Sequence, residues 1–118
     1  MVLPALRGQA AEREAERFLE RQGLGIVARN YRRPFGEIDL IAREGGVLVF
    51  VEVRKRSHRG FADGAESIDR RKCQRLRRTA AAYLQQTRWQ GPVRFDVLVL
   101  DAGNRIEWLQ DAIQEESW

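Results

Sequence analysis

Two strongly β-forming apolar runs, separated by a Gly-Gly pair, constrain the fold of this chain more than any other feature. Both residues 36–41 and residues 49–54 place acidic residues among apolar ones, most of them β-branched. Burying an unpaired carboxylate in such a run is costly. The Gly-Gly pair favours a two-residue loop, because both positions tolerate a positive φ. Residues 37–54 are therefore predicted to form a β-hairpin.

The register of this hairpin brings acidic residues together. A two-residue loop opposes Asp39 to Glu52 and Glu37 to Arg54, and alternation along the strands places all four side chains on one face. Opposed residues have Cβ atoms about 5 Å apart, where two carboxylates repel unless a cation lies between them. Ligands that are all oxygen suit Mg²⁺ or Mn²⁺ better than a soft metal. Asp39 and Glu52 are thus the predicted metal ligands.

Two alternatives to the metal site stay open at this point. A three-residue loop over 44–46 would oppose Asp39 to Val51 and turn the two carboxylates to different faces. In the other alternative, the acids of the first run are edge-strand charges, and Glu52 pairs with a basic neighbour.

The composition predicts a soluble, cytoplasmic, single-domain protein. A chain of 118 residues, 43% hydrophobic and 32% charged, fits one domain with a real core. No run approaches membrane-spanning length, and the N-terminus lacks the pattern of a secretory signal. The single cysteine, Cys73, excludes an internal disulfide and is interpreted as core packing. The domain is expected to span residues 1–118, with an acidic tail from about residue 110.

Basic charge is concentrated in one part of the chain. Residues 54–78 contain ten Lys or Arg and three Asp or Glu, a balance that suits a phosphate backbone. Of the 21 basic residues 19 are Arg, which offers bidentate phosphate contacts but equally follows from coding bias. The side chains predicted to contact phosphates are Arg56, Arg59, Arg70, Arg71, Lys72 and Arg75.

The remaining elements follow from hydrophobic periodicity and turn signals. Helices are predicted over about 8–22 and over about 67–87, the second with Ser67 as its N-cap. Strands are predicted over 24–31, within the hairpin, over 93–100 and over 105–109. The order α-β-β-β-α-β-β predicts an α/β fold with a mixed sheet flanked by helices. Glu12 lies at the edge of the first helix's buried stripe, from which its carboxylate can reach the end of a sheet.

These residues together resemble a known family. Glu12 on the first helix, Gly-Glu-Ile-Asp at 36–39, Phe-Val-Glu-Val-Arg at 50–54 and Lys72 at the start of the second helix resemble the YraN-like uncharacterised protein family. The resemblance extends from about residue 8 to residue 96. That family is similar to Holliday junction resolvases of the PD-(D/E)XK nuclease superfamily, whose restriction-endonuclease-like core is αβββαβ.

The resemblance implies roles for four residues. Glu12 would be the superfamily's helix glutamate, and Asp39 and Glu52 its metal-binding carboxylates. Arg54 stands where the superfamily has a Lys that positions or activates the attacking water. Arg keeps the charge but does not release a proton at neutral pH. An ion pair between Arg54 and Glu37 is the structural alternative to a catalytic role.

The resemblance thus implies a metal-dependent endonuclease, with Mg²⁺ or Mn²⁺, that acts on structured or branched DNA. Its expected catalytic residues are Glu12, Asp39, Glu52 and Arg54, and analogy with resolvases suggests a homodimer. Two other functions stay open. The protein would be a non-catalytic nucleic-acid-binding module if Arg54 prevents turnover, or a protein-interaction subunit that docks a partner through its acidic, Trp-ended tail.

Overall fold

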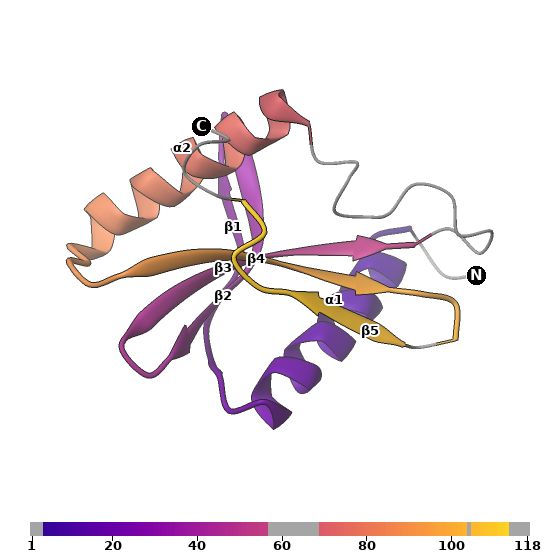
Figure 1. Cartoon of the computed structure of the whole chain (residues 1–118). Coiled ribbons are helices and arrows are strands. Elements are labelled where there is room, and N and C mark those ends of the chain that lie inside the picture. The colour runs from indigo at the N-terminus through magenta and orange to yellow at the C-terminus, as the bar shows by residue number, and fades with distance from the viewer. Residues whose placement is uncertain (1–3, 57–68, 104, 114–118) are drawn as a thin grey trace.

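The computed structural model describes residues 4–56, 69–103 and 105–113, and the predicted element order is confirmed in them (Figure 1). The second helix begins after Asp69 rather than after the predicted Ser67. The Asp69 side chain accepts a hydrogen bond from the backbone N–H of Lys72, as an N-cap does. The elements are α1 (Pro4–Arg21), β1 (Gly25–Arg33), β2 (Gly36–Glu44), β3 (Val47–Lys55), α2 (Arg70–Thr87), β4 (Val93–Leu100) and β5 (Ile106–Leu109).

The strands form one mixed sheet in the order β1-β2-β3-β4-β5. The first three strands are antiparallel neighbours, β4 runs parallel to β3, and β5 returns antiparallel to β4. A parallel pair needs a long crossover connection, and α2 lies within the segment that joins β3 to β4. This arrangement confirms the predicted α/β fold and is compatible with a restriction-endonuclease-like core.

The two helices cover opposite faces of the sheet (Figure 1). Ala15 and Leu19 of α1 pack on one face, against side chains such as Val51 and Leu98. On the other face, α2 buries an apolar stripe that includes Cys73, as predicted for that residue. Among the described residues, no helix is long and apolar enough to cross a membrane.

The hairpin has the predicted two-residue loop. Glu44 pairs with Val47 and Ile41 with Phe50, which rules out the three-residue alternative. Gly45 has a φ of 59°, a value that favours glycine. The regular ladder between β2 and β3 extends from this turn to the pair Leu40–Val51.

Beyond that pair the ladder gives way to a side-chain contact. The backbone N–H of Val53 donates to Asp39 Oδ2 at 2.8 Å, so a carboxylate oxygen takes the place of a backbone acceptor. The alternation of β2 also changes here, because Ile38 packs on the α2 side and Leu40 on the α1 side. Asp39 therefore lies where the regular pairing ends and β2 turns away from β3.

Candidate functional site

Asp39 and Glu52 meet at the point where β2 and β3 part. Their side chains are joined by a hydrogen bond, and Glu52 is only 7% exposed. Burial, followed by the negative charge of Glu52, raises the pKa of Asp39 to about 8, although the bond from Val53 opposes that rise. The pair therefore holds a proton at neutral pH, as two carboxyl groups in contact require.

Two cations from different elements neutralise Glu52. Lys72 Nζ lies 2.6 Å from Glu52 Oε2, and Arg54 Nη1 lies 3.6 Å from the same oxygen. Arg54 shares a face of β3 with Glu52, whereas Lys72 reaches the sheet from the first turn of α2. The sequence assigned Lys72 to phosphate contacts alone, and the structure instead brings its ammonium to the carboxylate pair.

Gly36 sets how closely α2 approaches the sheet. A Cβ atom at this position would lie 2.5 Å from Thr79 Oγ1 and 3.2 Å from the backbone oxygen of Arg75. Thr79 cannot easily turn away, because it is buried and its hydroxyl donates to that same oxygen at 2.7 Å. Only glycine allows this approach, and it holds the first turns of α2 beside the carboxylates.

The carboxylate pair opens into a hollow of about 160 Å³, which we call the carboxylate pocket. Acidic groups from the sheet line one side, and basic groups from successive turns of α2 line the other. A phosphate placed here would meet the positive charge of Lys72 and Arg75 next to the carboxylate pair. The lining residues are Gly36, Glu37, Asp39, Glu52, Lys72, Arg75 and Leu76.

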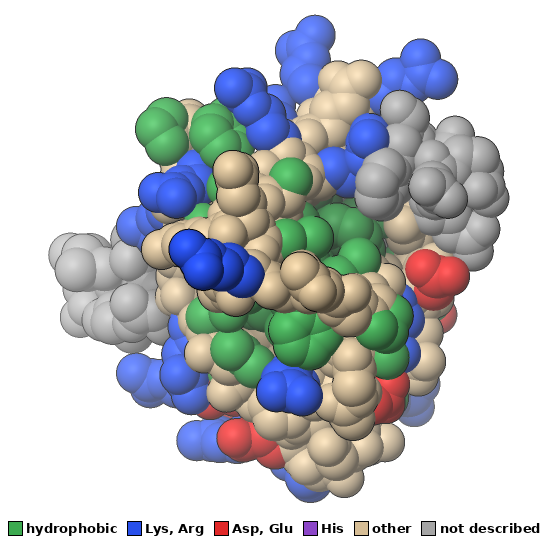
Figure 2. Space-filling model, turned by 90° about the vertical axis from the view of Figure 1, so that its left-hand side faces the viewer, with side chains coloured by type: hydrophobic (Ala, Val, Ile, Leu, Met, Phe, Trp, Pro, Cys, Tyr) green, Lys and Arg blue, Asp and Glu red, His purple; other side chains and the backbone are tan. Residues whose placement is uncertain are grey.

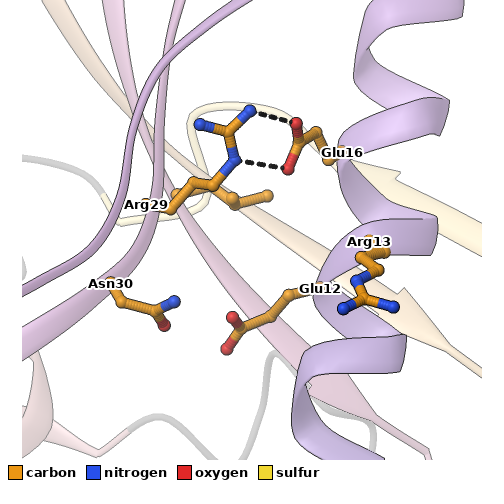
Figure 3. Close-up of a pocket in the computed structure, with 6 residues that line it drawn as sticks. Glu12, Arg13, Glu16, Arg29 and Asn30 are labelled. Atoms are coloured by element: carbon orange, nitrogen blue, oxygen red, sulfur yellow. Dashed lines mark hydrogen bonds and ion pairs between the residues drawn. The ribbon is translucent and has the colours of Figure 1, made fainter. Parts of the chain in front are cut away.

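Glu12 lies in a neighbouring hollow of about 410 Å³ between α1 and β1 (Figure 3). Its side chain and that of Asn30 extend toward each other. With the Asn30 amide oriented to satisfy both neighbours, its nitrogen donates to Glu12 Oε1 at 3.0 Å and to Glu37 Oε2 at 3.2 Å. Burial raises the pKa of Glu12, and the charges of Glu37 and Glu52 add to the rise while the Asn30 bond opposes it. Glu12 thus interacts electrostatically with the carboxylate pocket but does not line it.

Asn30 is a site residue to which the sequence assigned no role. Its φ of 50° is rare for a residue other than glycine, although Asn tolerates it better than most. Asn30 and Asp39 fall between the strand pairs Arg29–Leu40 and Tyr31–Ile38. The left-handed backbone of Asn30 thus lies opposite Asp39, and the Asn30 amide lies between Glu12 and Glu37. No sequence pattern signals this conformation beyond the residue type.

The donor set fits a divalent cation. Two carboxyl groups that share a proton can exchange it for a metal cation, because the proton and the cation each reduce the repulsion between the two carboxylates. In the described part of the chain, no group of three or more His, Cys, Asp or Glu side chains is placed to hold a metal ion. A cation held by Asp39 and Glu52 would complete its shell with water and phosphate oxygens, as Mg²⁺ commonly does.

The predicted basic residues do not all gather at the carboxylate pocket. Arg75 lines it, and Arg70 and Arg71 are exposed on the first turn of α2. Arg56 instead pairs with Glu107 of β5 at 2.5 Å, and Arg59 lies outside the described residues. Basic side chains also occur elsewhere on the surface. On the face in Figure 2, Lys and Arg side chains lie around an area of hydrophobic side chains.

The alternative explanation for Arg54 does not match its contacts. The ion-pair partner of Glu37 is Arg32, at 3.2 Å across the β1–β2 hairpin. Arg54 lies instead toward Glu52. The predicted pairing of Glu37 with Arg54 fails because β2 turns away from β3 at Asp39, before the ladder reaches that pair.

Comparisons with known proteins identify relatives along most of the chain. The sequence model of a family described as "Uncharacterised protein family UPF0102" matches residues 11–100. A UPF0102 protein from Halorhodospira halophila is 54% identical, over 97% of this chain and 92% of the relative. UPF0102 proteins from Shewanella amazonensis and Methylobacillus flagellatus are 49% and 50% identical, each over 89% of this chain and over 96% and 94% of the relative.

Proposed function

The chain belongs to the UPF0102 family, and we propose that it is a metal-dependent endonuclease that acts on structured or branched DNA. The observation that carries the proposal is the contact between Asp39 and Glu52 in a pocket whose opposite wall is basic. A carboxylate pair next to cations on a helix matches the needs of phosphodiester hydrolysis, which requires a bound cation and stabilisation of negative charge on oxygen.

Asp39 and Glu52 would hold the cation, Mg²⁺ or Mn²⁺. Such a cation, when bound, lowers the pKa of a coordinated water and draws negative charge from a phosphate oxygen. Asp39 must lose its proton before it can serve as a ligand. Glu52 keeps one oxygen on Lys72 and Arg54, so these two cations also fix the orientation of its carboxylate.

Lys72 supplies a property that Arg54 lacks. A Lys ammonium can give up a proton in a suitable environment, whereas a guanidinium remains charged. Lys72 is a third exposed and borders the pocket, so its ammonium is accessible to a phosphate or a water there. Lys72 would orient the attacking water, and Arg54 would stabilise the charge that develops on the phosphate.

The first turns of α2 would hold the flanking DNA. Arg70, Arg71 and Arg75 offer charge to phosphates without reading bases. Lys72 lies in the first turn of α2, at the positive end of the helix dipole. The net charge of +4 favours the same class of partner. The preference for branched DNA, and a homodimer that would cut two strands, rest on the resemblance alone.

The proposal is tested by cleavage of labelled DNA. A four-way junction, a flap and a plain duplex are incubated with the purified protein and millimolar Mn²⁺ or Mg²⁺, and products are resolved on a denaturing gel. We expect cleavage of a branched substrate that EDTA and Glu52→Gln both abolish. Glu107→Gln is the matched control, because Glu107 also pairs with an arginine but lies in a different hollow.

Two results would contradict the proposal. Products that survive in Glu52→Gln would point to a contaminating nuclease. Absence of any product, with all three DNAs bound, would instead support the non-catalytic module, which the Arg at position 54 favours.

A further inference from the structure

An aromatic ring stacked with an arginine lies close in sequence to residues that line the carboxylate pocket. Phe35 occupies the two-residue loop between β1 and β2, which the pair Arg33–Gly36 closes. The guanidinium carbon of Arg78, on α2, lies 4.3 Å from the centre of the Phe35 ring. We call this pair the Phe35–Arg78 stack.

The stack adjoins the pocket along two segments of the chain. Phe35 directly precedes Gly36 and Glu37, which line the pocket, and Arg78 follows Arg75 by one turn of α2. The close approach of Gly36 to α2 therefore also brings the two members of the stack together. A DNA strand that enters the carboxylate pocket would therefore pass near the stack.

The stack is open to solvent. Arg78 is exposed and Phe35 is only half-buried, whereas most aromatic rings of a small domain gain more by full burial. A second arginine, Arg33, lies 5.4 Å from the ring of Tyr31 on the adjoining strand. Planar groups that face water beside positive charge are the features that proteins use to bind unpaired nucleotides.

We propose that the Phe35–Arg78 stack is a platform for an unpaired base of a DNA strand whose phosphate enters the carboxylate pocket. The proposal rests on the proposed function and names its substrate class, DNA with at least one unstacked nucleotide. A base inside a duplex has both faces covered by its neighbours, so it cannot lie on the stack. A flap, a junction centre or a single strand exposes such a face.

The test compares two probes of equal charge in EDTA, so that cleavage plays no part. One is a short thymidine oligonucleotide, and the other is an abasic oligonucleotide of the same length. The wild type is expected to bind the thymidine strand about tenfold more tightly, because stacking of one base contributes a factor of about that size. Phosphate contacts alone would give equal affinities.

Three variants locate the preference. Phe35→Leu keeps apolar volume but removes the π face, so it is expected to lose the preference for thymidine while binding the abasic strand as before. Phe35→Trp restores a larger face and is expected to keep the preference. Trp89→Leu is the matched control, because the Arg43 guanidinium lies 5.2 Å from the Trp89 ring. Trp89 lies against Gly91, and Arg43 is at the other end of β2 from Gly36.

The outcomes are distinct from those of the cleavage assay. Equal affinity of the wild type for both oligonucleotides would overturn the platform, even if a junction is cut. Equal weakening of both probes by Phe35→Leu would overturn it too, and so would a selective loss in Trp89→Leu that matches the loss in Phe35→Leu. A selective loss confined to Phe35→Leu supports the platform, even if no cleavage is found.

Discussion

Lys72 and Glu52 form a 2.6 Å ion pair that joins the first turn of α2 to the centre of the sheet. Glu52 is almost fully buried, so removing its nearest cation would leave a poorly solvated carboxylate. Arg54 lies 3.6 Å from the same oxygen and compensates only in part. Under the proposed function, Lys72 and Arg54 would together take the part that the resembled superfamily gives to a strand Lys.

Lys72→Met is expected to lower the rate of cleavage by about a hundredfold or more, the range typical of losing a charged group at the transition state. Arg54→Lys is expected to preserve cleavage, and Arg54→Ala to reduce it while leaving DNA binding nearly intact. Single-turnover rates on a labelled junction measure both effects. Lys55→Met is the control, because Lys55 is an exposed lysine on β3 next to Arg54.

If Lys72→Met cuts as fast as the wild type, Lys72 serves only to pair with Glu52. Wild-type rates in Arg54→Ala would likewise make Arg54 structural. Melting temperatures of both variants separate these results from simple unfolding.

The raised pKa of Asp39 predicts how stability depends on pH. Its ordinary value is 3.8, and in the folded protein it rises to about 8. Between these values the folded protein retains a proton that the unfolded chain has lost, so the free energy of unfolding falls as pH increases. Asp39→Asn keeps a neutral group and is expected to flatten that dependence. Urea unfolding in EDTA, across this pH window, measures the slope.

A divalent cation should reverse the loss at the upper end of the window. Millimolar Mg²⁺ or Mn²⁺ is expected to raise the melting temperature most where Asp39 has released its proton. Asp39→Asn should show no such gain. If the free energy of unfolding depends on pH in the same way in the wild type and the variant, the pair does not share a proton. A melting temperature that neither ion changes would argue against the cation site.

The exposed arginines of α2 predict salt-dependent DNA binding. Reversing Arg70, Arg71 and Arg75 to Glu is expected to weaken binding and to flatten the slope of log affinity against log salt, because fewer counterions are released. Fluorescence anisotropy with a labelled duplex at several salt concentrations measures this slope. Reversing Arg56, which already pairs with Glu107, is expected to change it less. An unchanged slope in the triple variant would place the DNA surface elsewhere.

The hairpin was predictable because local rules determine it. The Gly-Gly turn, the strand alternation and the burial of one face all favour the same register, and the pairs Ile41–Phe50 and Glu44–Val47 follow. The same register, continued one pair beyond Leu40–Val51, placed Asp39 opposite Glu52. Local rules could not predict that β2 departs from β3 at Asp39. The departure depends on the Val53 N–H donating to a side-chain oxygen and not to a backbone oxygen.

The roles of Lys72 and Arg56 required tertiary information. Both read as surface cations in a basic stretch. Lys72 reaches Glu52 because α2 packs closely against Gly36, which has no side chain. Arg56 meets Glu107 because β5 pairs with β4. Sequence periodicity shows which face of a helix is buried. It does not show which strand that face packs on, or at which position along the strand.

Gly36 therefore provides the sharpest test of how the fold positions the site. Gly36→Ala places a Cβ atom 2.5 Å from Thr79 Oγ1, so α2 must shift away from β2. We expect a loss of stability of about 1–3 kcal/mol from this overpacking. We also expect slower cleavage, because the shift carries Lys72 away from Glu52. Urea unfolding and single-turnover rates measure the two effects.

Gly46→Ala is the matched control for this substitution. Gly46 also lies in a hairpin, its φ is not positive, and a Cβ atom there would meet nothing within 4 Å. It is expected to leave stability and cleavage nearly unchanged. Combining Gly36→Ala with Thr79→Ala removes the hydroxyl that the new Cβ meets, although the Arg75 oxygen still crowds it at 3.2 Å. The double variant should therefore be less damaged than the two single losses added together. Strict additivity would mean that the hydroxyl is not what the new methyl group meets, and α2 would then owe its position to contacts other than the one at Gly36.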